Sequence, residues 1–103
     1  MAKLILNNSN FDTTVKEGVT LVDFFANWCG PCRALMPIIE SIAEERTDIK
    51  VGAVNVDEQA ELAQRFGIVS IPTLIIIKDG TVVNRTVGAK PKQQILSLID
   101  SVL

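Results

Sequence analysis

Two cysteines separated by two residues are the side chains of this sequence best suited to chemistry. Cys29 and Cys32 stand in the segment Trp28-Cys29-Gly30-Pro31-Cys32 and are the only cysteines of the chain. At this spacing two thiols can close a disulfide or exchange one with another protein. A zinc site needs about four ligands, and a chain with two cysteines and no histidine cannot supply such a Cys or His set by itself. The spacing therefore favours thiol–disulfide exchange, and no metal is expected.

A strand and a helix are expected on either side of this pair. Val19 to Ala26 is apolar except for Thr20 and Asp23, which is typical of a central strand covered on both faces. From Cys32 to about Arg46, apolar side chains recur at helical spacing, which predicts an amphipathic helix. Pro37 lies inside this helix, where it removes a backbone donor and crowds the preceding turn, so we expect a kink there.

The start of that helix gives the two thiols different roles. Cys29 lies at or near the helix N-terminus, where unpaired N–H groups and the helix dipole favour a thiolate and lower the pKa of the thiol. We therefore predict that Cys29 is the attacking thiol. Cys32 is nearly one turn further along the same helix face, close enough to close a disulfide but shielded by the turn before it. We predict that it is the resolving thiol.

Two less reactive interpretations of the pair stay open. The first is a static disulfide, but a loop of about four residues gives only roughly 2 kcal/mol in the chain-entropy model, at the weak end for disulfides. The second is a pair of ordinary reduced cysteines. Cysteine is usually buried, whereas Cys29 follows Trp28 at the expected helix start, and Trp28 is expected beside an exposed cysteine. Redox chemistry is therefore the preferred interpretation.

The rest of the chain alternates short strands and helices. Lys78-Asp79-Gly80 has the composition of a hairpin turn, so the strands on either side of it are expected to be antiparallel. This order predicts an α/β sandwich in which helices flank a mixed central sheet. The expected strands are Leu4–Leu6, Val19–Ala26, Lys50–Val56, Thr73–Ile77 and Thr81–Val87; the expected helices are Phe11–Lys16, Cys32–Arg46, one from the N-cap Asp57 to about Phe66, and a last one with Pro91 in its first turn.

Composition argues against several classes of protein. The 103 residues suit one domain spanning 1–103, and 48% of them are hydrophobic. The net charge of −2 comes from 10 basic and 12 acidic residues scattered along the chain, so no basic patch favours nucleic acid or anionic lipid. The apolar run Leu4–Leu6 is too short for a signal-peptide core or a membrane span. We expect a cytoplasmic monomer that binds neither nucleic acid nor membrane.

The segment from Val22 to Cys32, together with Ile71-Pro72-Thr73, resembles the thioredoxin family. The resemblance covers essentially the whole chain and implies a thioredoxin-like three-layer sandwich. Further family elements appear in the expected order: Asp23 in the buried strand, Pro37, Asn55-Val56-Asp57 and Gly88.

The resemblance implies a protein-disulfide reductase that cycles between a Cys29/Cys32 dithiol and a disulfide. The Cys29 thiolate attacks the disulfide of a protein substrate, and Cys32 attacks the resulting mixed disulfide. A separate reductase, either flavin-containing and drawing on NADPH or ferredoxin-linked, then restores the dithiol, and the chain itself binds no cofactor. Related oxidants and isomerases carry a His between the cysteines that stabilises the reduced state. Gly30 and Pro31 carry no charge, so we hypothesise a reducing potential.

Asp23 interrupts an apolar strand and shares a face with Leu21 and Phe25, so we expect it to be buried. Desolvation disfavours the carboxylate and is expected to raise the pKa of Asp23 above about 3.9. One alternative is an aspartate at the strand edge that binds a backbone donor. By resemblance, Asp23 lies beneath Cys32 and exchanges protons with it.

We expect a shallow apolar groove for substrates beside the cysteine pair. It is formed by Trp28, Ile71, Pro72 and Gly88, together with Gly30 and Pro31. From the residues alone, Pro72 could equally be an entry residue of the following strand, and Trp28 could pack in the core. In the family the bond before the matching proline is cis and faces the cysteines, where it offers substrate a backbone edge.

Three positions depart from the common family pattern. Phe25 stands where a second Trp is usual, and Asn27 stands where a charged residue or Pro is frequent. Ala53 replaces a Lys that in many relatives lies near the buried aspartate, so Asp23 is expected to lack that cation and to have a pKa that is raised further.

Two rival functions stay open. One is a non-catalytic module that uses this fold to dock a partner, which the intact cysteine pair argues against. The other is a glutathione-dependent, glutaredoxin-like reductase, which Gly30-Pro31 and the position of Asp23 argue against.

Overall fold

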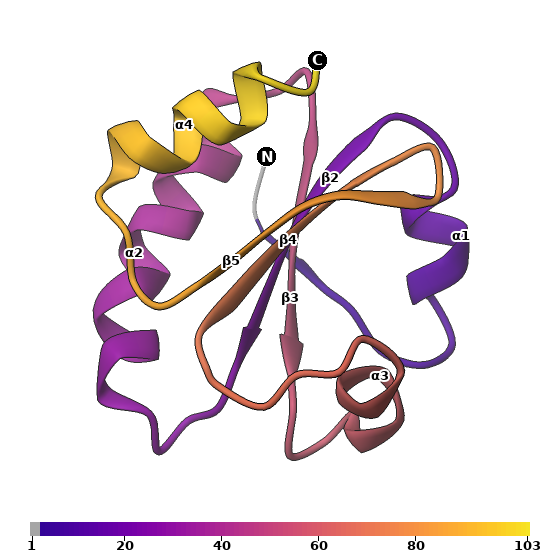
Figure 1. The fold of residues 1–103 in the computed structure, drawn as a ribbon, viewed down its shortest axis with the longest axis vertical. Helices are drawn as coiled ribbons and strands as arrows, with labels where there is room; N and C mark the ends of the chain where they lie inside the picture. Colours follow the sequence, from indigo (N-terminus) through magenta and orange to yellow (C-terminus); the bar gives the residue numbers. More distant parts are fainter. Residues whose placement is uncertain (1–2) are drawn as a thin grey trace.

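A mixed sheet of five strands forms the centre of the computed structural model, which describes residues 3–103 (Figure 1). The strand order is β1-β3-β2-β4-β5. β1, β3 and β2 run parallel, whereas β4 pairs antiparallel with β2 and with β5. The bounds are β1 (Leu4–Ile5), β2 (Val19–Phe25), β3 (Lys50–Asn55), β4 (Thr73–Lys78) and β5 (Thr81–Val87). The predicted central position of β2 is confirmed.

Within residues 3–103, four helices cover the two faces of the sheet, which gives the three layers of the predicted sandwich (Figure 1). Buried side chains of α2 and α4 pack with Leu21 of β2 in one core cluster. Buried side chains of α1 and α3 pack with Val22 and Phe24 in a second cluster on the opposite face. The bounds are α1 (Phe11–Val15), α2 (Gly30–Glu45), α3 (Ala60–Arg65) and α4 (Lys92–Asp100).

α2 begins two residues before the predicted start. Gly30 is its first residue and Pro31 lies in the first turn, where a proline loses no intrahelical hydrogen bond. Pro37 lies inside α2, and the helix continues past it to Glu45. The kink expected there stays a prediction.

The predicted N-cap at Asp57 is wrong. α3 begins only at Ala60, with Gln59 as its N-cap residue. The side chain of Asn55 accepts hydrogen bonds from the backbone N–H groups of Asp57 at 2.9 Å and Glu58 at 3.3 Å, and this turn delays the helix. Pro91 is likewise the N-cap of α4 and not a residue of its first turn.

One turn and one close contact fix the sheet. Asp79 and Gly80 join β4 to β5 with φ angles of 51° and 84°, the positive values that a two-residue hairpin turn requires. Gly52 of β3 lies under Leu6, whose Cδ1 would be 2.5 Å from a Cβ atom at position 52. Only a glycine therefore lets the chain after β1 pack this closely on β3.

Among residues 3–103, no helix is both long and apolar enough to cross a bilayer.

Candidate active site

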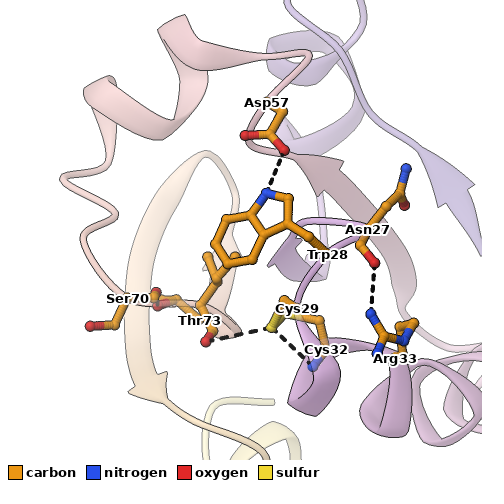
Figure 2. Close-up of a disulfide and its surroundings, with 9 residues drawn as sticks. Asn27, Trp28, Cys29, Cys32, Arg33, Asp57, Ser70 and Thr73 are labelled. Carbon is orange, nitrogen blue, oxygen red and sulfur yellow. Dashed lines mark hydrogen bonds between the residues drawn. A yellow bond between two sulfur atoms is a disulfide. The ribbon is translucent and has the colours of Figure 1, made fainter.

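Cys29 and Cys32 form a disulfide at the N-terminus of α2, with their Cα atoms 5.2 Å apart (Figure 2). Cys29 is the N-cap residue, and its Sγ accepts a hydrogen bond from the backbone N–H of Cys32 at 3.2 Å. A negative charge on this sulfur would gain from that donor and from the positive end of the helix dipole. The structure therefore provides a physical reason why a thiolate at Cys29 would be stabilised.

The two sulfurs differ in access. Cys29 is 5% exposed and Cys32 is 0% exposed, so an incoming group can reach only the first of them. The expectation of an exposed Cys29 is wrong, because most of its surface is covered. The residues that pack around the cysteine pair are Phe25, Ala26, Val56 and Ile71. Phe25 still packs here although it stands where the family usually has Trp.

The loop before β4 faces the disulfide. The Ile71–Pro72 peptide bond is cis, as the family resemblance implied. The carbonyl oxygen of Ile71 lies 3.9 Å from Sγ of Cys29. Pro72 has no N–H, so it offers a partner no backbone donor. Its carbonyl oxygen already accepts a hydrogen bond from the backbone N–H of Gly88 at 2.8 Å. The φ of Gly88 is 94°, a conformation that suits glycine.

Trp28 lies on the surface beside the pair. Its side chain is largely exposed, and the residue retains 69% of its accessible surface, so the alternative of a core Trp is wrong. Its Nε1–H donates a hydrogen bond to Oδ2 of Asp57 at 2.8 Å (Figure 2). This role of Asp57 was missed in the sequence. The register pairs Phe25 with Asn55, so the residues that follow β2 and β3 emerge at the same sheet edge, and this pairing is a feature of the folded chain that brings Asp57 to Trp28.

A cation lies near the residues between the cysteines, although Gly30 and Pro31 carry none. The guanidinium of Arg33 donates a hydrogen bond to the carbonyl of Asn27 at 2.9 Å. One of its nitrogens lies 3.9 Å from the place of a Cβ atom at Gly30. Gly30 and Pro31 are exposed at the first turn of α2.

Asp23 is 0% exposed, as predicted. Among residues 3–103, neither of its carboxylate oxygens has a hydrogen-bond partner, so the alternative of an aspartate bound to a backbone donor is wrong. Its neighbours across the sheet are Ala53 in β3 and Leu74 in β4, both apolar. Desolvation raises the pKa of Asp23 to about 7.

Lys3 opposes that rise, because its positive charge lowers the pKa of Asp23. Ala53 does pair directly with Asp23, as the missing lysine at that position suggested. Asp23 therefore lacks the lysine usual at position 53, and Lys3, which precedes β1, contributes a positive charge instead. No local pattern in the sequence indicates this, because the pairing of β1 with β3 and of β3 with β2 brings the two residues to one face of the sheet.

The family model Thioredoxin matches residues 2–101. The chain belongs to the thioredoxin family. A thioredoxin of Chlamydia pneumoniae is 47% identical over 96 residues, which are 93% of this chain and 94% of the relative. A thioredoxin of Bacillus subtilis strain 168 is 42% identical over 97% of both chains.

Solved structures give the same result. A mutant thioredoxin from Halobacterium salinarum NRC-1 superposes with a TM-score of 0.91 at 36% identity, over 97% of this chain and 89% of that one.

With its cysteine pair at disulfide distance, this thioredoxin-family chain is a thiol–disulfide oxidoreductase, a reductase of protein disulfides. Its partners are disulfide-containing substrates and a reductase that restores the dithiol. Among residues 3–103, no group of three or more metal-binding side chains occurs.

Proposed function

We propose that this thioredoxin-family protein reduces protein disulfides with Cys29 as nucleophile and Cys32 as resolving thiol. The Cys29 thiolate attacks one sulfur of the substrate disulfide, and the other sulfur leaves as a thiolate that takes up a proton. The Cys32 thiolate then attacks Sγ of Cys29, and the second substrate thiol leaves. Two electrons pass to the substrate, and Cys29 and Cys32 end as a disulfide. The observation that carries this assignment is the unequal access of the two sulfurs at the N-terminus of α2.

Asp23 is proposed as the proton-transfer group for Cys32. It takes the proton of the Cys32 thiol when Cys32 attacks, and it returns a proton when Cys32 leaves again. A buried carboxyl with a pKa of about 7 can do both near neutral pH. Asp23 shares its sheet face with Leu21, which packs in the cluster under α2, and Cys32 lies in α2.

Trp28, Ile71, Pro72 and Gly88 are proposed to form the substrate groove. The cis bond and the hydrogen bond from Gly88 fix the Pro72 backbone, so the edge that a substrate backbone can pair with belongs to Ile71. Gly30 and Pro31 are proposed to keep the potential reducing, since neither supplies the cationic His of the oxidising relatives.

We further propose that the protein is a monomer in which residues 1–103 act as one domain, and that it works in the cytoplasm. One sheet with both faces covered supports the single domain, and a reducing compartment suits a protein that must be kept as a dithiol. The regenerating reductase is proposed to be flavin-containing and NADPH-dependent, or ferredoxin-linked. Light scattering tests the monomer, and reduction by each type of reductase tests the partner.

The deciding experiment is turnover of a disulfide-bonded protein by catalytic amounts of this chain, with dithiothreitol as electron source. Cys29→Ser is expected to have no activity above the uncatalysed rate. Cys32→Ser is expected to accumulate a mixed disulfide with the substrate, detected by mass spectrometry. Ser101→Ala, in which a serine after α4 is changed, serves as control for handling and is expected to match the wild type. If the wild type itself equals the uncatalysed rate, the pair is not catalytic and a docking role replaces this proposal.

A further inference from the structure

A pocket of about 280 Å³ lies beside the resolving cysteine. Cys32 and Met36 of α2 form one side of it, Phe25 and Asn27 come from the end of β2, and Lys3 contributes from before β1. This volume is far above the roughly 10–15 Å³ that one water needs. Water can therefore enter this pocket, which lies next to Cys32, although Cys32 itself has no exposed surface.

The sheet register places Lys3 on the same face as Asp23. Ile5 pairs with Ala53, and Ala53 pairs with Asp23, so these three residues form one row across β1, β3 and β2. Paired residues of parallel strands point to the same face, and residues two apart along a strand do so as well. Lys3 and Asp23 therefore both lie on the face that α2 covers.

The ammonium of Lys3 is held against α2. Its Nζ lies 3.3 Å from Sδ of Met36 and 3.6 Å from Oε1 of Glu40. The side chain of Lys3 is 19% exposed and that of Glu40 is 58% exposed. A thioether is a weak acceptor, and an ion pair with an exposed carboxylate is weakened by water. Much of the field of this ammonium is therefore left to act on the interior.

The other charges around this region are few. At the level of Asp23, β3 and β4 contribute the apolar Ala53 and Leu74. From α2, Arg33 lines the same pocket, and Glu40 and Glu44 line a neighbouring pocket together with Lys3. Glu58, which follows β3, lines a further pocket together with Lys3 and Ala53. The positive charge of Lys3 lowers the pKa of Asp23 and so favours the carboxylate.

We propose that Lys3 is a positioning residue for the proton step at Cys32, and that its ammonium, set in the pocket beside Cys32, stabilises the carboxylate that Asp23 presents as base. The inference rests on the proposed proton transfer by Asp23. In that step the Cys32 thiol gives its proton to Asp23, the Cys32 sulfur bonds to Cys29, and the substrate thiolate leaves. Lys3 acts through its positive charge alone: it raises the ionised fraction of Asp23 and takes no part in the proton exchange.

The test compares Lys3→Met, which keeps the aliphatic stem, with Lys3→Arg, which keeps the charge. Lys16→Met is the matched control, because it removes one charge from an exposed lysine after α1. The pKa of Asp23 is followed by NMR titration of its carboxyl carbon in the oxidised protein. Lys3→Met is expected to raise this pKa by about 0.5 or more, the effect of one partly screened charge. Lys3→Arg and Lys16→Met are expected to leave it near the wild-type value.

The second readout is the rate at which the mixed disulfide is resolved, measured as release of the second substrate thiol in a single turnover across pH. With a pKa near 7, a rise of about 0.5 lowers the ionised fraction at pH 7 about two-fold, so Lys3→Met is expected to slow resolution about two-fold there. The difference is expected to vanish above about pH 9, where Asp23 is ionised in both proteins.

Asp23→Asn separates the two proposals. If Asp23→Asn changes the pH profile of resolution but Lys3→Met behaves like Lys16→Met in both readouts, the role of Lys3 is refuted and that of Asp23 stands. If neither Asp23→Asn nor Lys3→Met changes the profile, the proton transfer by Asp23 fails and the role of Lys3 fails with it. An unchanged pKa of Asp23 in Lys3→Met overturns the inference whatever the kinetics show.

Discussion

Replacing Asp23 by Asn is expected to stabilise the oxidised protein at neutral and alkaline pH. Burial raises the pKa of Asp23 from 3.8 to about 7, and no hydrogen bond within residues 3–103 offsets the desolvation of the carboxylate. Below about pH 4 the carboxyl is protonated in both folded and unfolded chains and makes no difference. Between pH 4 and 7 the unfolded chain releases a proton that the folded chain keeps, so the free energy of unfolding falls as the pH rises.

The size of this loss follows from the pKa difference of about three. Since one pKa unit corresponds to about 1.36 kcal/mol, the full loss above pH 7 is about 4 kcal/mol, an upper value because the buried site relaxes. Asn stays neutral at every pH, so the variant is expected to lack this slope. It keeps a buried amide at a place with no partner, which costs about 1–3 kcal/mol. The net gain above pH 8 is therefore expected to be about 1–3 kcal/mol.

Urea unfolding of the oxidised protein between pH 5 and 9 measures this difference. The lower limit avoids the titration of Asp12 and Asp48, whose pKa values are lowered by Arg65 and Arg46 and whose contributions are lost in acid. Glu17→Gln, at an exposed carboxylate, is the control and is expected to keep the wild-type slope. Equal slopes for the wild type and Asp23→Asn across this range would refute the reasoning.

Three further substitutions test other contacts. Asp57→Ala removes the acceptor of the Trp28 indole N–H and is expected to raise KM for a protein substrate about five-fold, as the loss of about 1 kcal/mol implies. Asp57→Asn keeps an acceptor and is expected to raise KM less. Steady-state kinetics measures both, and a KM for Asp57→Ala equal to that of the wild type would contradict this prediction. Gly52→Ala forces a Cβ against Leu6 and is expected to cost about 1–3 kcal/mol in urea unfolding, a result that an unchanged midpoint excludes. Gly88→Ala places a side chain at a φ of 94° and is expected to lower the unfolding free energy by about 1–2 kcal/mol, with no loss counting against the argument.

Much of the fold could be predicted because it depends on local patterns. The apolar run from Val19 and the helical period after Cys32 determine β2 and α2, since each pattern can be satisfied only by an element with that period. The cysteine pair lies where the two elements join, so its position at a helix N-terminus followed directly. The errors at Asp57 and Pro91 concern helix starts, where one side-chain hydrogen bond moves a boundary by a few residues.

The types and spacing of the residues identify those that can do chemistry: two thiols at a spacing that permits a disulfide, and an acid in an apolar strand. What surrounds these groups depends on the folded chain. Lys3 is far from Asp23 in the chain, and Asp57 is far from Trp28, yet parallel pairing brings each pair to one region of the sheet. Desolvation and Coulomb interactions depend on distances in space, and strand pairing across long loops sets those distances. Local sequence patterns carry no information about that pairing, so the groups that tune Asp23 and hold Trp28 became visible only in the folded chain.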